Sequence, residues 1–160
     1  MSPGKFIRIP HSPIIRLCTS PPKEEPQIVA HLERCAQTVE TFAPEQIILF
    51  GPDHYAGFHL ALMPSFCVGF EATAIDDVGG NPGPLAVPAD AALALVQHLR
   101  AEGFDPAISR KMRVDHGFSQ PLARLFGSND RYPIIPVFID TMTPPFARFA
   151  RTRSFGEAVG

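Results

Sequence analysis

Two short, continuous apolar runs constrain the fold of this chain most: residues 46–50 (QIILF) and 132–139, which contain IIPVFI. A strand with one face in water alternates apolar and polar residues, whereas a strand covered on both faces is apolar throughout. The runs therefore predict strands buried on both faces, as in parallel sheets that carry helices on each side. Further strands are expected at residues 6–9, within residues 60–74 and at residues 106–109.

Two amphipathic helices are predicted between these strands. From residue 24 to residue 42 the apolar positions recur at steps of three and four, and Pro44 ends the pattern. Residues 89–102 repeat this spacing, with Gly103 placed to end the helix. Shorter helices are expected at 119–126 and 146–160, and loops at 76–88 and 114–117. Strands that alternate with helices predict an α/β fold: a single layered domain over residues 1–160, with a mainly parallel central sheet flanked by helices.

Composition excludes several classes of protein. Of the 160 residues, 45% are hydrophobic and 19% charged, which is typical of a globular chain and not of a disordered one. The formal net charge of −2 is scattered, without the basic patch that nucleic-acid binders carry. The apolar runs are far shorter than the roughly 20 residues that cross a bilayer. We therefore expect neither a nucleic-acid nor a membrane partner.

The cysteines and the first residues bear on location. Cys18, Cys35 and Cys67 are an odd number at wide spacing, which favours reduced thiols over a disulfide framework. Cys35 and Cys67 lie in apolar surroundings and are expected in the core. The start MSPGKFIRIP lacks the apolar segment of a signal peptide. These features predict a cytoplasmic protein.

Three of the six histidines, His11, His54 and His116, directly follow predicted strands. In layered α/β folds the ligand site lies beyond the carboxyl ends of the strands. Neutral imidazoles gathered there suit iron, zinc, copper or nickel. A single histidine of this kind is more often an ordinary surface or core residue, and both interpretations stay open at this level. Asp53 and Asp115 precede two of these histidines and are candidates for hydrogen-bond acceptors or helix N-caps.

Several segments, in order along the chain, carry a family resemblance. They are residues 11–13 (HSP), 52–58 (PDHYAGF), 63–67 (MPSFC), 72–75 (ATAI), 114–122 (VDHGFSQPL) and 151–158 (RTRSFGEA). Together they resemble the class III extradiol ring-cleavage dioxygenases. The likeness is closest to the 2,3-dihydroxyphenylpropionate 1,2-dioxygenase group, within the superfamily of the protocatechuate 4,5-dioxygenase catalytic subunit.

The resemblance implies an oxidoreductase that opens a catechol with dioxygen at a non-haem Fe(II), in the breakdown of aromatic compounds. In that family two histidines and one glutamate hold the iron and leave positions open for substrate and dioxygen. By motif, His11 and His54 match the two histidine ligands, and His116 matches an acid–base histidine beside the metal. An imidazole suits proton transfer because its ordinary pKa of about 6.5 lies near working pH.

The same resemblance covers only the N-terminal half of the family pattern. The glutamate ligand and a second catalytic histidine have no counterpart by motif, and Glu71 and Glu157 are expected at the surface. We therefore expect weak iron binding and little turnover by these residues alone. An apolar patch on the last helix, from Phe146, Phe149, Phe155 and Val159, is expected to meet a second copy or a complementing chain. The alternative is a truncated or degenerate, catalytically inactive metal-binding or interaction domain.

Overall fold

A computed structural model describes residues 4–12, 20 and 22–160 of the chain. Pro13 of the first motif and Cys18 lie outside these described residues. Along the chain the elements are α2 (Glu25–Phe42), β1 (Ile47–Gly51), β2 (Phe66–Gly69), β3 (Ala72–Ala74), β4 (Gly83–Pro84), α3 (Ala89–Ala101), β5 (Ala107–Ser109), β6 (Met112–Val114), α4 (His116–Phe126), β7 (Ile134–Ile139) and α5 (Phe149–Val159).

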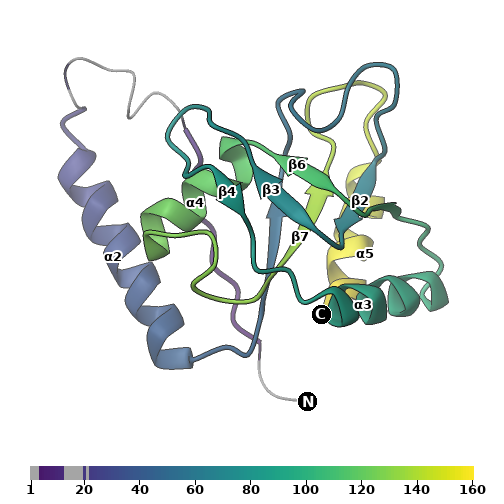
Figure 1. Ribbon diagram of the computed structural model, residues 1–160, viewed down its shortest axis with the longest axis horizontal. Helices are drawn as coiled ribbons and strands as arrows, with labels where there is room; N and C mark the ends of the chain where they lie inside the picture. The colour runs from purple at the N-terminus through teal and green to yellow at the C-terminus, as the bar shows by residue number, and fades with distance from the viewer. Residues whose placement is uncertain (1–3, 13–19, 21) are drawn as a thin grey trace.

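The strands form two sheets, of order β1-β7-β2-β5 and β4-β3-β6. The pairs β1–β7, β2–β5 and β3–β6 are parallel, whereas β2–β7 and β3–β4 are antiparallel. The expected α/β domain with a mainly parallel central sheet is therefore confirmed. The second, smaller sheet, which lies in front of the first in Figure 1, was not expected.

Each face of the four-stranded sheet has its own core. Because side chains alternate along a strand, Ile135 and Val137 of β7 face one way and Ile134 and Phe138 the other. The first face packs against α3 and α5, around Phe155. The second packs against the small sheet and the apolar side of α4, through Phe118 and Leu122. Helix α2 lies outside α4, at the far side of the molecule from α3 and α5 (Figure 1).

Two strand predictions need correction. Residues 6–9 form no strand: among the described residues their backbone makes no hydrogen bond, and Phe6 is 80% exposed. Strand β1 is only half-buried up to its last residue, although its apolar run predicts burial on both faces. The reason is its place at the edge of the sheet, where it lines a groove of about 980 Å³ together with residues 4–9, α2 and α4.

Three local boundaries also differ from expectation. Residues 112–114 form β6 and not part of a loop, because Met112 and Val114 point into the core while Arg113 points out. The loop at 76–88 includes the two-residue strand β4. Helix α4 begins at His116 and not at Ser119, because the Asp115 side chain accepts a hydrogen bond from the Gly117 N–H and caps the helix there.

Cys35 and Cys67 are buried and free, as expected. Burial raises the pKa of the Cys67 thiol to about 12, so this thiol is neutral at physiological pH. None of the helices in the described part of the chain is long and apolar enough to cross a membrane.

The expected exposed apolar patch at the last helix is wrong for two of its four members. Phe146 and Phe149 are exposed, but Phe155 is fully buried and Val159 is half-buried against the same core. The Phe155 ring stacks on Phe66 at 4.1 Å between centroids and meets Phe104 edge-on at 5.4 Å. Phe155 therefore anchors α5 to the sheet and is not available to a partner.

We predict that Phe155→Ala lowers the free energy of unfolding by about 3–5 kcal/mol, because it removes a large side chain from a filled core. Phe149→Ala is the matched control: it makes the same change on the same helix, at a side chain that is 95% exposed. That control is expected to stay within about 0.5 kcal/mol of the wild type. Urea denaturation measures both, and equal effects of the two substitutions would contradict the packing described.

Candidate active site

Three histidine side chains from separate segments meet at one place. His11 lies in the extended residues 4–12, His54 in the loop after β1, and His116 at the first position of α4. The ring centroids of His11 and His54 are 5.4 Å apart, and those of His11 and His116 are 6.0 Å apart. The His54 and His116 rings stack at 4.3 Å. The structure thus brings together the three histidines that the sequence singled out.

The loop that carries His54 is organised by Asp53. This carboxylate is 2% exposed and accepts hydrogen bonds from the backbone N–H groups of Ala56, Gly57 and Phe58, at 2.9–3.1 Å. Gly57 lies against the Arg113 carbonyl, where an added Cβ would come within 2.2 Å of the oxygen. Only glycine permits this approach. The loop is therefore held both from within and against β6.

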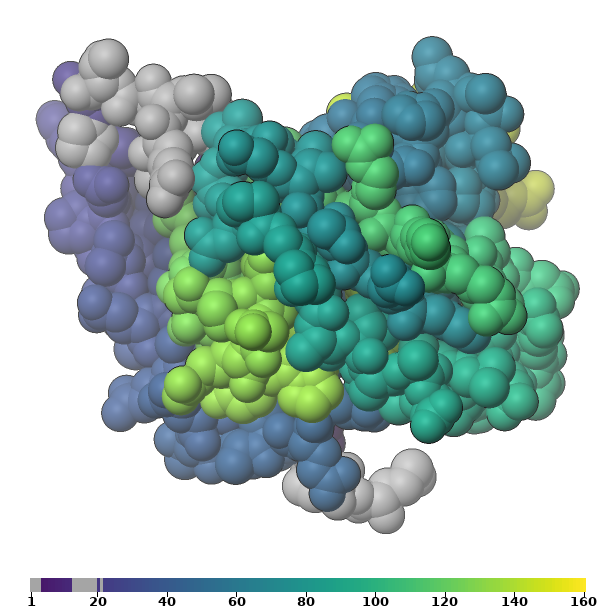
Figure 2. All heavy atoms as spheres, in the orientation of Figure 1, coloured from purple at the N-terminus to yellow at the C-terminus, as the bar shows by residue number. Residues whose placement is uncertain are grey.

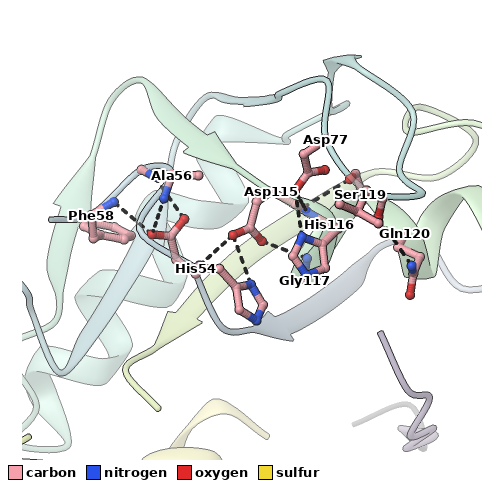
Figure 3. A network of polar contacts seen from close by, with 12 residues as sticks. His54, Ala56, Phe58, Asp77, Asp115, His116, Gly117, Ser119 and Gln120 are labelled. Atoms are coloured by element: carbon pink, nitrogen blue, oxygen red, sulfur yellow. Dashed lines mark hydrogen bonds and ion pairs between the residues drawn. The ribbon is translucent and has the colours of Figure 1, made fainter. Parts of the chain in front are cut away.

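Asp115 holds His54 from the other side. Its Oδ2 accepts a hydrogen bond from the His54 backbone N–H at 2.6 Å and lies 3.1 Å from His54 Nδ1. Its Oδ1 accepts the capping hydrogen bond from Gly117 at 2.8 Å. Asp115 thus orients His54 across the site and not its sequence neighbour His116 (Figure 3). The N-cap interpretation of this aspartate is confirmed.

His116 is paired with Asp77, which sequence reasoning missed. Asp77 Oδ2 lies 2.6 Å from His116 Nδ1 and accepts the His116 backbone N–H at 3.0 Å. Asp77 follows β3 by three residues, and β3 runs parallel to β6, so both strands end at the same edge. Asp77 lies in the loop predicted at residues 76–88, just beyond the strands predicted within residues 60–74, but only histidines were selected at such positions.

The loops after β1 and after β3 form two lobes at one end of the molecule. Figure 2 shows them in blue and teal, with a notch between them. Tyr55 of the first lobe bonds through its hydroxyl to Thr143 Oγ1 at 3.1 Å, which ties this loop to the one after β7. Apart from His11, which no strand precedes among the described residues, the site residues follow the carboxyl ends of strands, as layered α/β folds predict.

The charge state of His11 follows from its surroundings. Burial is the largest cause that lowers its pKa below the usual 6.5, followed by repulsion from His54 and then His116, while Asp115 acts in the opposite direction. His11 is therefore neutral at neutral pH. A neutral imidazole has a free nitrogen lone pair, which is the form that binds metals.

The donor set fits a transition metal in part. One potential metal-binding group, His54, Asp115 and His116, has its ligand atoms within 4.8 Å of one another. Both oxygens of Asp115, however, are engaged by hydrogen bonds, so this carboxylate orients His54. His54 Nδ1 contacts Asp115, and Nε2 is the other ring nitrogen of His54. Glu71 and Glu157 are exposed, as expected.

Comparison with known proteins identifies the family. Residues 5–160 match the family model described as the catalytic LigB subunit of aromatic ring-opening dioxygenase. The chain belongs to this family. The description of the family agrees with the ring-cleavage dioxygenases that the motifs resemble.

Two curated relatives of this LigB-family chain are named as dioxygenases of the same substrates. A 2,3-dihydroxyphenylpropionate/2,3-dihydroxicinnamic acid 1,2-dioxygenase 2 from Pseudomonas putida is 47% identical over 133 residues, which cover 82% of this chain and 42% of the relative. An enzyme of the same name, without the final number, from Paraburkholderia xenovorans is 44% identical over 154 residues, or 94% of this chain and 48% of the relative. The chain thus spans less than half the length of these two relatives.

We predict that the His11 ring titrates below pH 6.5 in the folded protein. The His11 ring then binds a proton more readily in the unfolded chain than in the folded one. Protonation of His11 therefore lowers the free energy of unfolding as the pH falls below about 6.5. An NMR titration of the ring protons measures the midpoint. His54→Gln removes one repelling imidazole, so it should raise the midpoint while burial keeps it below 6.5. A wild-type midpoint at or above 6.5 would contradict the burial and repulsion described.

Proposed function

We propose that this chain is the N-terminal half of the catalytic machinery of an extradiol dioxygenase. The substrate proposed is a catechol similar to 2,3-dihydroxyphenylpropionate, cleaved with dioxygen at a non-haem Fe(II). The observation that carries the proposal is the meeting of His11, His54 and His116 in a LigB-family fold. The names of the relatives support the substrate class.

His11 and His54 are proposed to hold the iron. His11 is neutral, and Asp115 fixes the His54 ring so that its second nitrogen is free. Iron bound there would join substrate and dioxygen at one centre and let electron density pass between them. In the overall reaction the ring opens beside one hydroxyl-bearing carbon, and both atoms of dioxygen remain in the product.

His116 is proposed as the acid–base residue and not as an iron ligand. Its Nδ1 contacts Asp77, so Nε2 is the nitrogen left for proton transfer. At Nε2 the imidazole accepts a proton from a catechol hydroxyl and later returns it to an oxygen of the opening ring. Its ring stacks directly on that of His54, which supports a proton transfer close to the proposed iron ligand.

The third iron ligand is proposed to come from other polypeptide, as a continuation of the sequence, a second copy or a complementing chain. Asp115 already has both oxygens engaged, and Asp77, whose Oδ2 is engaged with His116, does not belong to the potential metal-binding group of His54, Asp115 and His116. The apolar groove along β1 begins at His11 and extends to α5, so polypeptide bound there would reach the site. Cytoplasmic location and the absence of nucleic-acid and membrane partners stay predictions.

An inactive metal-binding or interaction domain is the second candidate. The observation that favours it is the same incomplete donor set around the three rings. As a metal-binding domain, this second candidate would have the same iron site as the dioxygenase and would differ from it only in lacking ring cleavage. The two experiments below separate iron binding from turnover.

We predict that this chain binds Fe(II) weakly and that His54→Ala abolishes the binding. Two neutral imidazoles leave the charge of the metal without a compensating carboxylate, and the substitution removes half of that set. Anaerobic titration measures it. His59→Ala is the control, because His59 is exposed and lies in the segment that follows the same strand. If His54→Ala and His59→Ala take up iron equally, the assignment of His54 is wrong.

We predict that the chain with Fe(II) alone cleaves 2,3-dihydroxyphenylpropionate with a kcat below about 1 per second, the lower end of ordinary enzyme rates. An oxygen electrode follows uptake, and mass spectrometry detects a product heavier than the substrate by one dioxygen. Fast uptake by a monomer would show that a carboxylate ligand has been overlooked.

Where a glutamate-bearing partner restores turnover, His116→Phe should keep catechol binding and slow cleavage about a hundredfold. Near-normal turnover would make His116 structural, and no cleavage in any combination would favour the inactive domain.

A further inference from the structure

Asp77 makes a contact that the fold of α4 does not require. The helix start is already capped by Asp115, which accepts the Gly117 N–H. Asp77 nevertheless reaches in from the loop after β3 and accepts the His116 backbone N–H at 3.0 Å, with Nδ1 of the ring at 2.6 Å. Both side chains are largely withdrawn from water, at 10% exposure for His116 and 18% for Asp77.

The second oxygen of Asp77 is buried and has no hydrogen-bond partner among the described residues. An unpaired buried oxygen is unfavourable, and a residue serving only as a cap would avoid it. Such a feature in a native structure calls for an explanation, and a functional role is one of those known. The explanation that the geometry offers is the short contact of Oδ2 with the His116 ring.

A carboxylate at Nδ1 decides which nitrogen of a neutral imidazole carries the proton. A carboxylate oxygen accepts only, so Nδ1 must donate and Nε2 is left with its lone pair. The same contact limits rotation of the ring. Figure 3 shows Asp77 on one side of His116 and the His54–Asp115 pair on the other, so each histidine has its own aspartate.

We propose that Asp77 is the positioning residue of His116, holding its ring as the Nδ1–H tautomer with Nε2 free on the side of the other histidines. Asp77 acts through His116 and contacts neither metal nor substrate. What His116 does with its free Nε2 rests on the proposed function. The tautomer itself does not, so the proposal is testable on the isolated chain without iron or catechol.

The test is ¹⁵N NMR of the chain labelled at histidine, at about pH 8.5, where imidazoles are neutral. The His116 signals are identified by their loss in His116→Gln. In the wild type His116 should be Nδ1–H, and Asp77→Ala should shift most of the population to Nε2–H, the form that neutral histidine favours in water. Asp76→Ala, the control, removes an exposed carboxylate from the adjacent position and should leave the tautomer unchanged.

Two outcomes would overturn the proposal. One is a wild-type His116 in the Nε2–H form, which needs no variant and stands even if Asp77→Ala does not fold. The other is a folded Asp77→Ala variant, checked by circular dichroism, that keeps Nδ1–H. Iron titration of the wild type and His54→Ala tests the proposed function separately. If the wild type binds no iron, or if His54→Ala binds as much iron as the wild type, and His116 has the expected tautomer, the function is rejected and the role of Asp77 is kept.

Discussion

The rest of the site depends on the hydrogen bonds that the Asp115 carboxylate accepts. Its Oδ2 accepts a hydrogen bond from the His54 backbone N–H and contacts His54 Nδ1. Its Oδ1 accepts a hydrogen bond from the Gly117 N–H in the first turn of α4. Hydrogen bonds to a charged acceptor are short and strong, and removing a buried acceptor leaves its donors unpaired. One side chain at 2% exposure therefore sets both where the His54 loop lies and where the helix that carries His116 begins.

Aspartates hold this site together, while the histidines supply its chemistry. Asp53 folds the loop, Asp115 orients His54, and Asp77 contacts His116. A carboxylate used in this way pairs with N–H groups and is less available to a metal. Asp115 has both oxygens engaged in this way, and Asp77 has its Oδ2 engaged with His116.

The pattern of side chains predicted the fold wherever burial was regular along the chain. The continuous apolar run at residues 132–139 predicted β7, because this strand is covered on both faces. The spacing of apolar residues at 24–42 predicted α2, because one side of the helix is apolar. The same reasoning wrongly predicted a strand at residues 6–9. At β1 it predicted the strand correctly but not its partial exposure, because the edge position of β1 depends on neighbours that the local sequence does not show. Strands as short as β4 and β6 carry too few residues for a period to be recognised.

By itself, the sequence determined the α/β class, the family through its ordered motifs, and the three histidines, because each of these is recorded in residue type and spacing. Which carboxylate serves which histidine was decided only by the tertiary structure. Asp115 precedes His116 yet orients His54, and Asp77, 39 positions from His116, is the residue that contacts its ring. The physical reason is that successive side chains diverge along the backbone. Hydrogen-bond partners are therefore chosen by the meeting of strand ends, which depends on the pairing of β3 with β6 and on the packing of α4 against both sheets.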